Sequence, residues 1–341
     1  MHGLRTLCLH LPLLLAACAS SRPFAVPGLP WEPQLYHCMR VAEPPEIDGK
    51  LDDAAWQDAT WTADFVDIEG ALQPGPRYRT RVKMAWDGTH LYIGAELEEP
   101  HVRATLEERD SVIYHDNDLE FFVDPDGDTH RYFELEINAF GTEWDLLLEK
   151  PYRDGGPART EWTMRGLKTA VFVDGTINDP SDVDSGWNVE MAVPWPALAR
   201  AAPRPGERWR INFSRVQWRA RVKKGRYEKV VDRSREPWAR ADNWVWSPQG
   251  LVNMHYPERW GIVQFGTRPD EKVELLEEER TRMHLYGIYY RQRRWKREKG
   301  TYFSGPGIVA TRDGFLATVT LRDGRRLAIR EDGLSWWSSA E

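Results

Sequence analysis

The feature that most constrains the fold of this chain is a period-two alternation of apolar and polar residues between residues 47 and 265. Short alternating runs recur there, separated by Gly, Pro, Asp and Asn residues, and helical spacing is scarce. Successive side chains of a β-strand point to opposite faces, so the pattern indicates strands with one buried face. We therefore predict an all-β fold over residues 46–266, an antiparallel β-sandwich of the jelly-roll or immunoglobulin-like kind.

Several runs are clear enough to place as strands. An Asp-Gly turn at Asp87 and Gly88 lies between two alternating arms of 78-YRTRVKMAWDGTHLYIGAEL-97, which predicts a hairpin. The runs 187-WNVEMAVP-194 and 208-RWRINFSRVQW-218 alternate in the same way, and we expect each to be one strand.

A second hairpin is predicted in 118-DLEFFVDPDGDTHRYFELEIN-138, bent at its Asp-rich centre. The odd-numbered positions of both arms are apolar, so they share the inner face. Pairing Phe121 with Phe133 then sets Glu120 opposite Glu134.

The same register sets Asp118 opposite Glu136, and facing like charges are destabilising. A neighbouring basic strand at residues 79–83, a bound cation or simple solvation could compensate. Two close carboxylates could also serve glycoside hydrolysis. No sequence motif of another catalytic class accompanies them.

The turn DPDGD brings together Asp124, Asp126 and Asp128, a spacing with some likeness to a calcium loop. It lacks the closing glutamate of the full twelve-residue motif. The alternative is an Asp- and Gly-rich turn that satisfies its own backbone, and this is the favoured interpretation.

The character of the chain changes after Gly266. Residues 270–300 carry apolar residues at near-helical spacing, acids first and bases last, which predicts one long helix ended by Gly300. Asp-Gly pairs at 313, 323 and 332 then divide a small β meander. We expect residues 267–341 to form an appended unit.

The N-terminus has the pattern of a targeting segment. Residues 1–17 are predicted to be a signal peptide, and LAAC at its end is similar to a bacterial lipobox with Cys18 as the acylated residue. Ala19 favours the outer membrane over inner-membrane retention. Proline-rich residues 18–45 are then a tether, and Cys38 is the cysteine that remains without a partner.

Composition narrows the function further. A net charge of −7 and a pI near 5.8 argue against a nucleic-acid partner. The chain also has 17 tryptophans, whose flat apolar rings suit sugar faces as well as protein cores. Outside the signal segment no run is apolar enough to span a membrane, so we expect attachment through lipid alone.

Four motifs in order then carry a family resemblance. The set 47-IDGKLDDAAW-56, 82-VKMAWDGTHLYIGAEL-97, 117-NDLEFFVDPDG-127 and 256-YPERWGIVQF-265 resembles family 9 carbohydrate-binding modules and their DOMON-like relatives. The resemblance runs over about residues 41–266. It implies a β-sandwich that binds sugars, and calcium ions occur in the family.

The resemblance also implies site residues. Two tryptophans clamp the sugar in the xylanase-linked modules, and their positions match Tyr114 and Met254 here. Glu120 matches a sugar-binding glutamate, and Asn138 a sugar-binding asparagine. Glu136 stands where those modules carry an arginine, which reverses a charge.

Two further residues are candidates for the lost clamp face. Trp246 and His255 lie near Met254 in the sequence and could supply another surface. Trp56 and Trp86 sit on apolar faces, so we expect them in the core.

Three functions follow as hypotheses. The leading one is a cell-envelope lipoprotein that binds carbohydrate without cleaving it and helps capture or process polysaccharide. A second is a structural or adaptor lipoprotein whose residues 270–341 bind a protein partner. A third is a glycoside hydrolase acting through Glu120 and Glu136.

Overall fold

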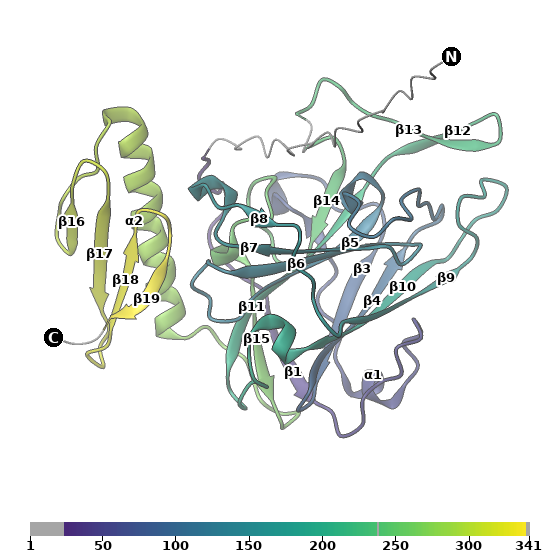
Figure 1. The fold of residues 1–341 in the computed structure, drawn as a ribbon, viewed down its shortest axis with the longest axis horizontal. Helices are drawn as coiled ribbons and strands as arrows, with labels where there is room; N and C mark the ends of the chain where they lie inside the picture. The colour runs from purple at the N-terminus through teal and green to yellow at the C-terminus, as the bar shows by residue number, and fades with distance from the viewer. Residues whose placement is uncertain (1–23, 237–238, 339–341) are drawn as a thin grey trace, which may run out of the picture.

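The computed structural model describes residues 24–236 and 239–338, and Figure 1 shows two parts. The larger part is one curled, mixed sheet of 13 strands, which gives the predicted sandwich. Its strands are β1 Leu35–Arg40, β2 Val66–Asp67, β3 Thr80–Trp86, β4 His90–Glu98, β5 Asp118–Asp124, β6 Tyr132–Asn138, β7 Glu143–Leu148, β8 Ala158–Arg159, β9 Lys168–Asp174, β10 Gly186–Pro194, β11 Arg208–Gln217, β14 Asp242–Val245 and β15 Gly261–Gly266.

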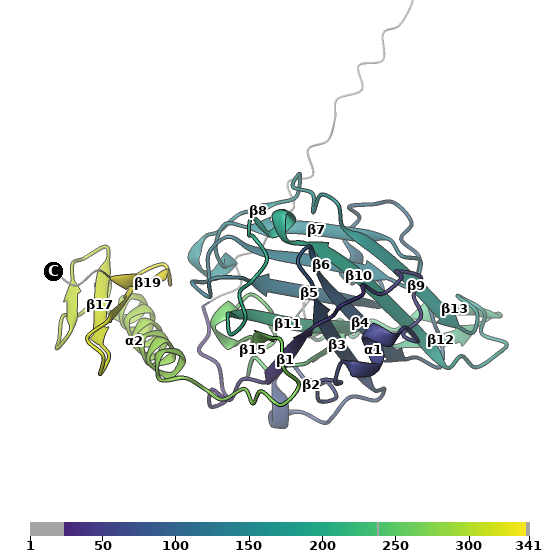
Figure 2. The ribbon, with the colours of Figure 1, turned by 90° about the horizontal axis from the view of Figure 1, so that it is seen from below.

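Neighbouring strands follow the order β8-β7-β6-β5-β11-β15-β1-β3-β4-β10-β9, and β14 pairs with β11 and β2. The sheet folds over on itself, so β3, β4 and β10 lie across from β5, β6 and β11 (Figure 2). The main core lies between these halves. It contains the odd-numbered residues of β5, among them Phe121, and Trp209, Ile211 and Phe213 of β11. Trp56 and Trp86 are buried, as predicted.

Short elements complete the sandwich. They are helix α1 Ala54–Asp58, the 3-10 turns η1 Gly70–Leu72, η2 Ile113–His115, η3 Tyr152–Asp154, η4 Trp195–Leu198 and η6 Pro257–Arg259, and a separate hairpin of β12 Ala220–Lys223 and β13 Arg226–Lys229. The predicted hairpin at Asp87 is confirmed as β3 and β4, where the Asp87 carboxylate accepts hydrogen bonds from the backbone N–H groups of Thr89 and His90.

Strand β1 corrects two predictions. The tether was expected over residues 18–45, yet Leu35–Arg40 is a strand that pairs in parallel with both β15 and β3. The sheet is therefore mixed rather than purely antiparallel, and the folded domain begins before residue 46. The physical reason is burial, because Tyr36 and Cys38 point into the main core.

The acidic hairpin has a different register from the prediction. Phe121 pairs with Leu135, so Glu120 lies opposite Glu136 and not Glu134. A shift of two residues keeps every side chain on its predicted face. The turn that fixes the register is longer than the DPDGD motif, since β6 begins only at Tyr132.

The smaller part is the C-terminal unit. Helix α2 Glu277–Lys299 begins seven residues later than predicted and ends at Gly300, which adopts the left-handed conformation at φ 74°. The predicted meander is confirmed as a four-stranded sheet of β16 Ile308–Ala310, β17 Phe315–Thr320, β18 Arg326–Arg330 and β19 Ser335–Ser338.

A buried polar contact joins this unit to the sandwich. The Arg153 guanidinium of η3 lies 2.9 Å from the Glu258 carboxylate of η6. From α2, the Tyr289 hydroxyl accepts a hydrogen bond from Arg153, and the Tyr290 hydroxyl donates one to Glu258 at 2.5 Å. Burying a charge without a partner costs free energy of folding. These paired contacts therefore hold the C-terminal unit against the sandwich.

In the described part of the chain, no helix has the length and apolar character needed to cross a bilayer.

Candidate functional site

Three carboxylates converge on the even-numbered face of β5 and β6. Asp118, Glu120 and Glu136 each offer an oxygen, and these oxygens all lie within 4.8 Å of one another. The residues are only 0%, 6% and 2% exposed. We call this set the acidic cluster. Simple solvation was one of the ways in which these charges could be compensated, and their burial argues against it.

Backbone amides support two members of the acidic cluster. Asp118 Oδ1 accepts a hydrogen bond from the Val216 N–H at 3.1 Å, while its buried Oδ2 has no hydrogen-bond partner among the residues that the structure describes. Glu136 Oε2 accepts one from the Tyr114 N–H at 2.8 Å. Burial, reinforced by the neighbouring carboxylates, raises the pKa of Asp118 and the pKa of Glu136 well above the usual range. The cluster can therefore retain protons that exposed carboxylates would lose.

The basic strand that was expected to compensate these charges lies elsewhere. Arg79 and Arg81 pair with Glu96 on β4 instead. The Lys229 ammonium of the β12–β13 hairpin lies over the Trp218 ring at 4.1 Å and donates to the His115 carbonyl. Its charge also interacts with the Asp118 carboxylate.

Two aromatic side chains border the acidic cluster. Tyr114 in η2 is 42% exposed, and its ring centroid lies 6.3 Å from that of the half-buried Trp144. Trp144 on β7 pairs with Glu136 on β6. Trp144 was not among the residues predicted for the site, although its place among polar residues is compatible with a ligand platform as well as with the core. Carboxyl groups and aromatic faces thus lie side by side here.

Asn138 is close to the acidic cluster, but its side-chain polar groups are all hydrogen-bonded within the protein. Its side-chain amide donates to the Leu106 carbonyl at 2.8 Å and to Asp116, and its side-chain oxygen accepts from the N–H groups of Phe140 and Thr142. It is completely buried. In this structure Asn138 shapes the turn after β6 and has no free polar group for a sugar.

The structure also corrects the place of Trp246. It is 1% exposed and packs in the main core, where its ring centroid lies 6.2 Å from that of Phe213 and 6.3 Å from that of Tyr36. The indole is buried there because residue 246 follows β14 on the side of the sheet that faces the core. Trp246 cannot present a stacking surface in this conformation.

Met254 and His255 lie at the other, apolar end of the face that carries the acidic cluster. Met254 is buried beside Trp260 and Phe122. The His255 ring is half-buried and lies 2.9 Å from the Tyr132 hydroxyl through Nδ1. Trp144 packs against the same apolar cluster, so this end is continuous with the Tyr114 side. Buried Met254 offers little surface to a ligand.

The Asp-rich turn forms the structure that the favoured interpretation predicted. Asp124 accepts hydrogen bonds from the Gly127 and Thr129 N–H groups at 3.1 and 2.9 Å, and Asp128 accepts one from the His130 N–H. Asp126 pairs with Arg200. Burial and neighbouring carboxylates raise the pKa of Asp128 to about 6.

A cation would need these same oxygens. The three aspartates do bring one oxygen each within 4.8 Å, as a calcium site requires. Most of those oxygens already accept backbone hydrogen bonds or pair with arginine, so the residues of this turn do not fit a calcium ion well. Calcium stays a prediction for a metal titration to test.

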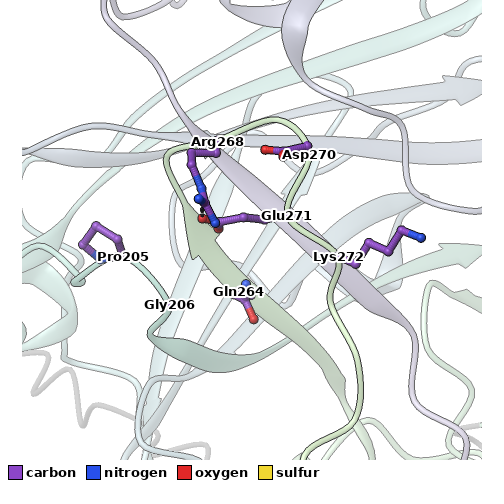
Figure 3. Close-up of a pocket in the computed structure, with 7 residues that line it drawn as sticks. All are labelled: Pro205, Gly206, Gln264, Arg268, Asp270, Glu271 and Lys272. Atoms are coloured by element: carbon purple, nitrogen blue, oxygen red, sulfur yellow. Dashed lines mark hydrogen bonds and ion pairs between the residues drawn. The ribbon is translucent and has the colours of Figure 1, made fainter.

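A separate open depression of about 530 Å³ lies at the end of β15 (Figure 3). Its lining includes Arg268 and Glu271, which form an ion pair. None of the residues predicted for the site lines it, so it does not belong to the acidic and aromatic face.

The curled sandwich, with carboxyl groups and aromatic rings gathered on one strand face, defines a small β-sandwich binding module. Residues 47–244, more than half of the chain, match the family described as carbohydrate family 9 binding domain-like. The chain belongs to this family. The membership confirms the resemblance seen in the sequence, and it agrees with a binding module rather than an enzyme.

Solved structures give further similarities. A family 9 carbohydrate-binding module from Caldicellulosiruptor kristjanssonii, solved with cellotriose, is 15% identical, with a TM-score of 0.43 over 72% of this chain and 100% of that one. The same organism's module with glucose is 16% identical, with a TM-score of 0.43 over 71% and 100%. A putative carbohydrate-binding protein from Bacteroides uniformis is 18% identical, with a TM-score of 0.48 over 69% and 100%. No curated protein sequence matches the chain.

Proposed function

We propose that this protein binds a poly- or oligosaccharide without cleaving it, at the exposed Tyr114 ring and the half-buried Trp144 ring, with the acidic cluster lying beneath and beside them. The observation that carries the proposal is the exposed Tyr114 ring beside Trp144, directly next to Glu120 and Glu136, in a chain of this family. Aromatic faces stack on the apolar face of a pyranose, and the neighbouring polar groups fix the orientation of its hydroxyls.

The raised pKa of Glu136 adds to this chemistry. A protonated carboxyl group can donate one hydrogen bond and accept others, whereas a carboxylate only accepts. Sugar hydroxyls both donate and accept, so a face with mixed protonation can satisfy both roles. The buried position of Glu136 therefore suits a neutral ligand better than a cationic one.

The cellular setting is part of the same proposal. Acylation of Cys18 would attach the protein to the cell envelope, with the outer membrane as the expected site. A sugar-binding domain held there would help capture polysaccharide for processing. Metabolic labelling with palmitate tests the anchor, and Cys18→Ser should abolish the label.

Isothermal titration tests the binding function. The full chain is titrated with xylo-, cello- and host-type oligosaccharides, each with calcium and with a chelator. We expect at least one series to bind, and Glu120→Gln and Glu136→Gln to weaken it by about tenfold or more, the loss of a charged or buried hydrogen bond.

Glu98→Gln is the matched control, because Glu98 is exposed at the end of β4. It should bind as tightly as the parent chain. If no sugar binds, either with calcium or with the chelator, the proposal is wrong.

A further inference from the structure

The second half of α2 carries an exposed basic surface with a tryptophan at its centre. Its exposed cations are Arg291, Arg294, Arg297 and Lys299. Trp295 is 40% exposed. We call these five residues the basic face of α2.

Aromatic contacts and an open depression lie at the centre of the basic face. The Trp295 ring lies 5.6 Å from that of Phe303 in an edge-to-face contact, and the Lys299 ammonium lies 5.9 Å from the Trp295 ring. Beside them is an open depression of about 660 Å³, lined by Arg291, Arg294, Trp295, Phe303 and one acid, Glu298. The surface therefore combines positive charge with an aromatic ring.

The first described residues of the chain lie against the neighbouring face of the same helix turns. The Phe24 ring contacts Tyr289 and Tyr290 at centroid distances of 6.0 and 6.2 Å, and the Arg293 guanidinium lies 5.1 Å from it. Arg297 donates a hydrogen bond to the Phe24 carbonyl at 3.4 Å. The chain thus enters the fold beside the basic face, between the sandwich and the C-terminal unit (Figure 1).

The distance from Cys18 to this point is short. Five residues, 19–23, separate Cys18 from Phe24, and one of them is Arg22. A fully extended chain advances about 3.5 Å per residue, so the gap can span at most about 20 Å. A bilayer that holds acylated Cys18 would therefore lie close to the basic face.

We propose that the basic face of α2 is a membrane-contact surface that binds the phosphate headgroups of an anionic phospholipid bilayer. This rests on the proposed acylation of Cys18. Arginine pairs with phosphate through two parallel hydrogen bonds, and tryptophan rings favour the headgroup level of a bilayer. The attraction extends over about one Debye length, roughly 8–10 Å at physiological salt, so the short tether keeps the face within reach.

The consequence is a second attachment that fixes orientation. A lipid anchor alone leaves the domain free to rotate about its tether. Contact through α2 would restrain the C-terminal unit, and the buried Arg153–Glu258 network would pass that restraint to the sandwich.

Vesicle sedimentation tests the surface without the anchor. The mature polypeptide from residue 18, carrying Cys18→Ser, is mixed with vesicles of phosphatidylcholine alone or with added phosphatidylglycerol. We expect binding only to the anionic vesicles, lost at high salt. Changing Arg291, Arg294 and Lys299 together to Gln should weaken it by about tenfold or more.

The matched control changes three exposed cations of the β12–β13 hairpin, Arg221, Lys223 and Arg226, to Gln. It removes the same charge and should bind like the parent. Thermal unfolding confirms that both triple variants are folded. Equal binding to neutral vesicles, or a basic-face variant that binds like its control, would overturn the proposal.

Two further outcomes separate this proposal from the others. If the protein binds anionic vesicles but takes no palmitate label, the proposed acylation of Cys18 is wrong and the membrane-contact surface is still supported. If the basic-face variant instead loses a co-purifying protein and vesicles never bind, the surface belongs to a protein partner and the membrane proposal is wrong.

Discussion

Glu136 Oε2 accepts a hydrogen bond from the backbone N–H of Tyr114 at 2.8 Å. This bond ties a buried acid of β6 to the most exposed aromatic residue of the candidate site. The position that reverses the family's expected charge is thus used to hold an aromatic residue in place. The position of Tyr114 therefore depends on the Glu136 carboxyl group.

The first prediction distinguishes the contribution of the Tyr114 ring to sugar binding from its contribution to stability. Tyr114→Ala removes a partly exposed stacking face, and an aromatic contact contributes about 0.5–1.5 kcal/mol, so sugar affinity should fall about 2- to 10-fold. The melting temperature should stay close to that of the parent. Titration calorimetry and thermal unfolding measure the two effects.

Phe172→Ala is the control for Tyr114→Ala. Phe172 lies on β9 and is 38% exposed, similar to Tyr114, but it is remote in sheet order from β5 and β6. Equal losses of affinity in both variants would mean that Tyr114 has no special place in binding.

The second prediction concerns pH. Because burial raises the pKa of Asp118, the folded chain binds more protons than the unfolded chain between the ordinary carboxyl pKa near 4 and the folded value. Stability should therefore fall as pH rises through that window. Asp118→Asn keeps an oxygen for the Val216 N–H and should make the fall shallower between pH 4 and 8.

Thermal unfolding over that pH range measures the slope. The control is Asp52→Asn, at an exposed position before α1, which should leave the slope as it is in the parent. A slope unchanged in Asp118→Asn would contradict the account of the acidic cluster.

The third prediction tests the corrected role of Trp246. Truncating a fully buried tryptophan leaves a cavity, so Trp246→Ala should lower the free energy of unfolding by about 3–5 kcal/mol. The milder Trp246→Phe should remain folded at room temperature and bind sugar with the affinity of the parent. Chemical denaturation and calorimetry check both statements, and selective loss of affinity in a folded Trp246→Phe variant would return Trp246 to the site.

The fourth prediction concerns the joint between the two parts. Arg153→Met leaves the Glu258 carboxylate buried without its cation, which should cost about 3–5 kcal/mol of stability. Arg268→Met breaks the more exposed pair with Glu271 and should cost less than about 1 kcal/mol. Similar losses from the two variants, measured by denaturant unfolding, would mean that the buried network does not hold the C-terminal unit.

Local patterns in the sequence were sufficient for much of the fold. Period-two alternation located the acidic strands, and Asp-Gly turns located the β3–β4 hairpin and the C-terminal meander. The register of β5 and β6 was wrong by two residues because a two-residue shift keeps every side chain on its face. Only the geometry of the turn decides between the registers, and it includes Thr129 and Arg131 at positive φ.

Long-range pairings could not be read in the same way. Strand β1 is hidden in a proline-rich stretch, and its partner Ile262 lies more than two hundred residues away. The contact of Trp144 with Tyr114 and the burial of Asn138 depend on which strands become neighbours. Family resemblance pointed to Glu120 and Asn138, but it could not show that Asn138 is buried in the turn after β6. Trp246 was chosen because it lies near Met254 in the sequence, which does not reveal that its side chain packs in the core.

The central claim is that a sugar binds on the Tyr114 and Trp144 face. The most direct test is a titration followed by the indole N–H signals in a nitrogen–proton correlation spectrum, each assigned by a Trp→Phe variant. Saturating oligosaccharide should shift the Trp144 signal and leave those of core Trp56 and Trp246 in place. A saturable titration that leaves Trp144 unmoved would contradict it.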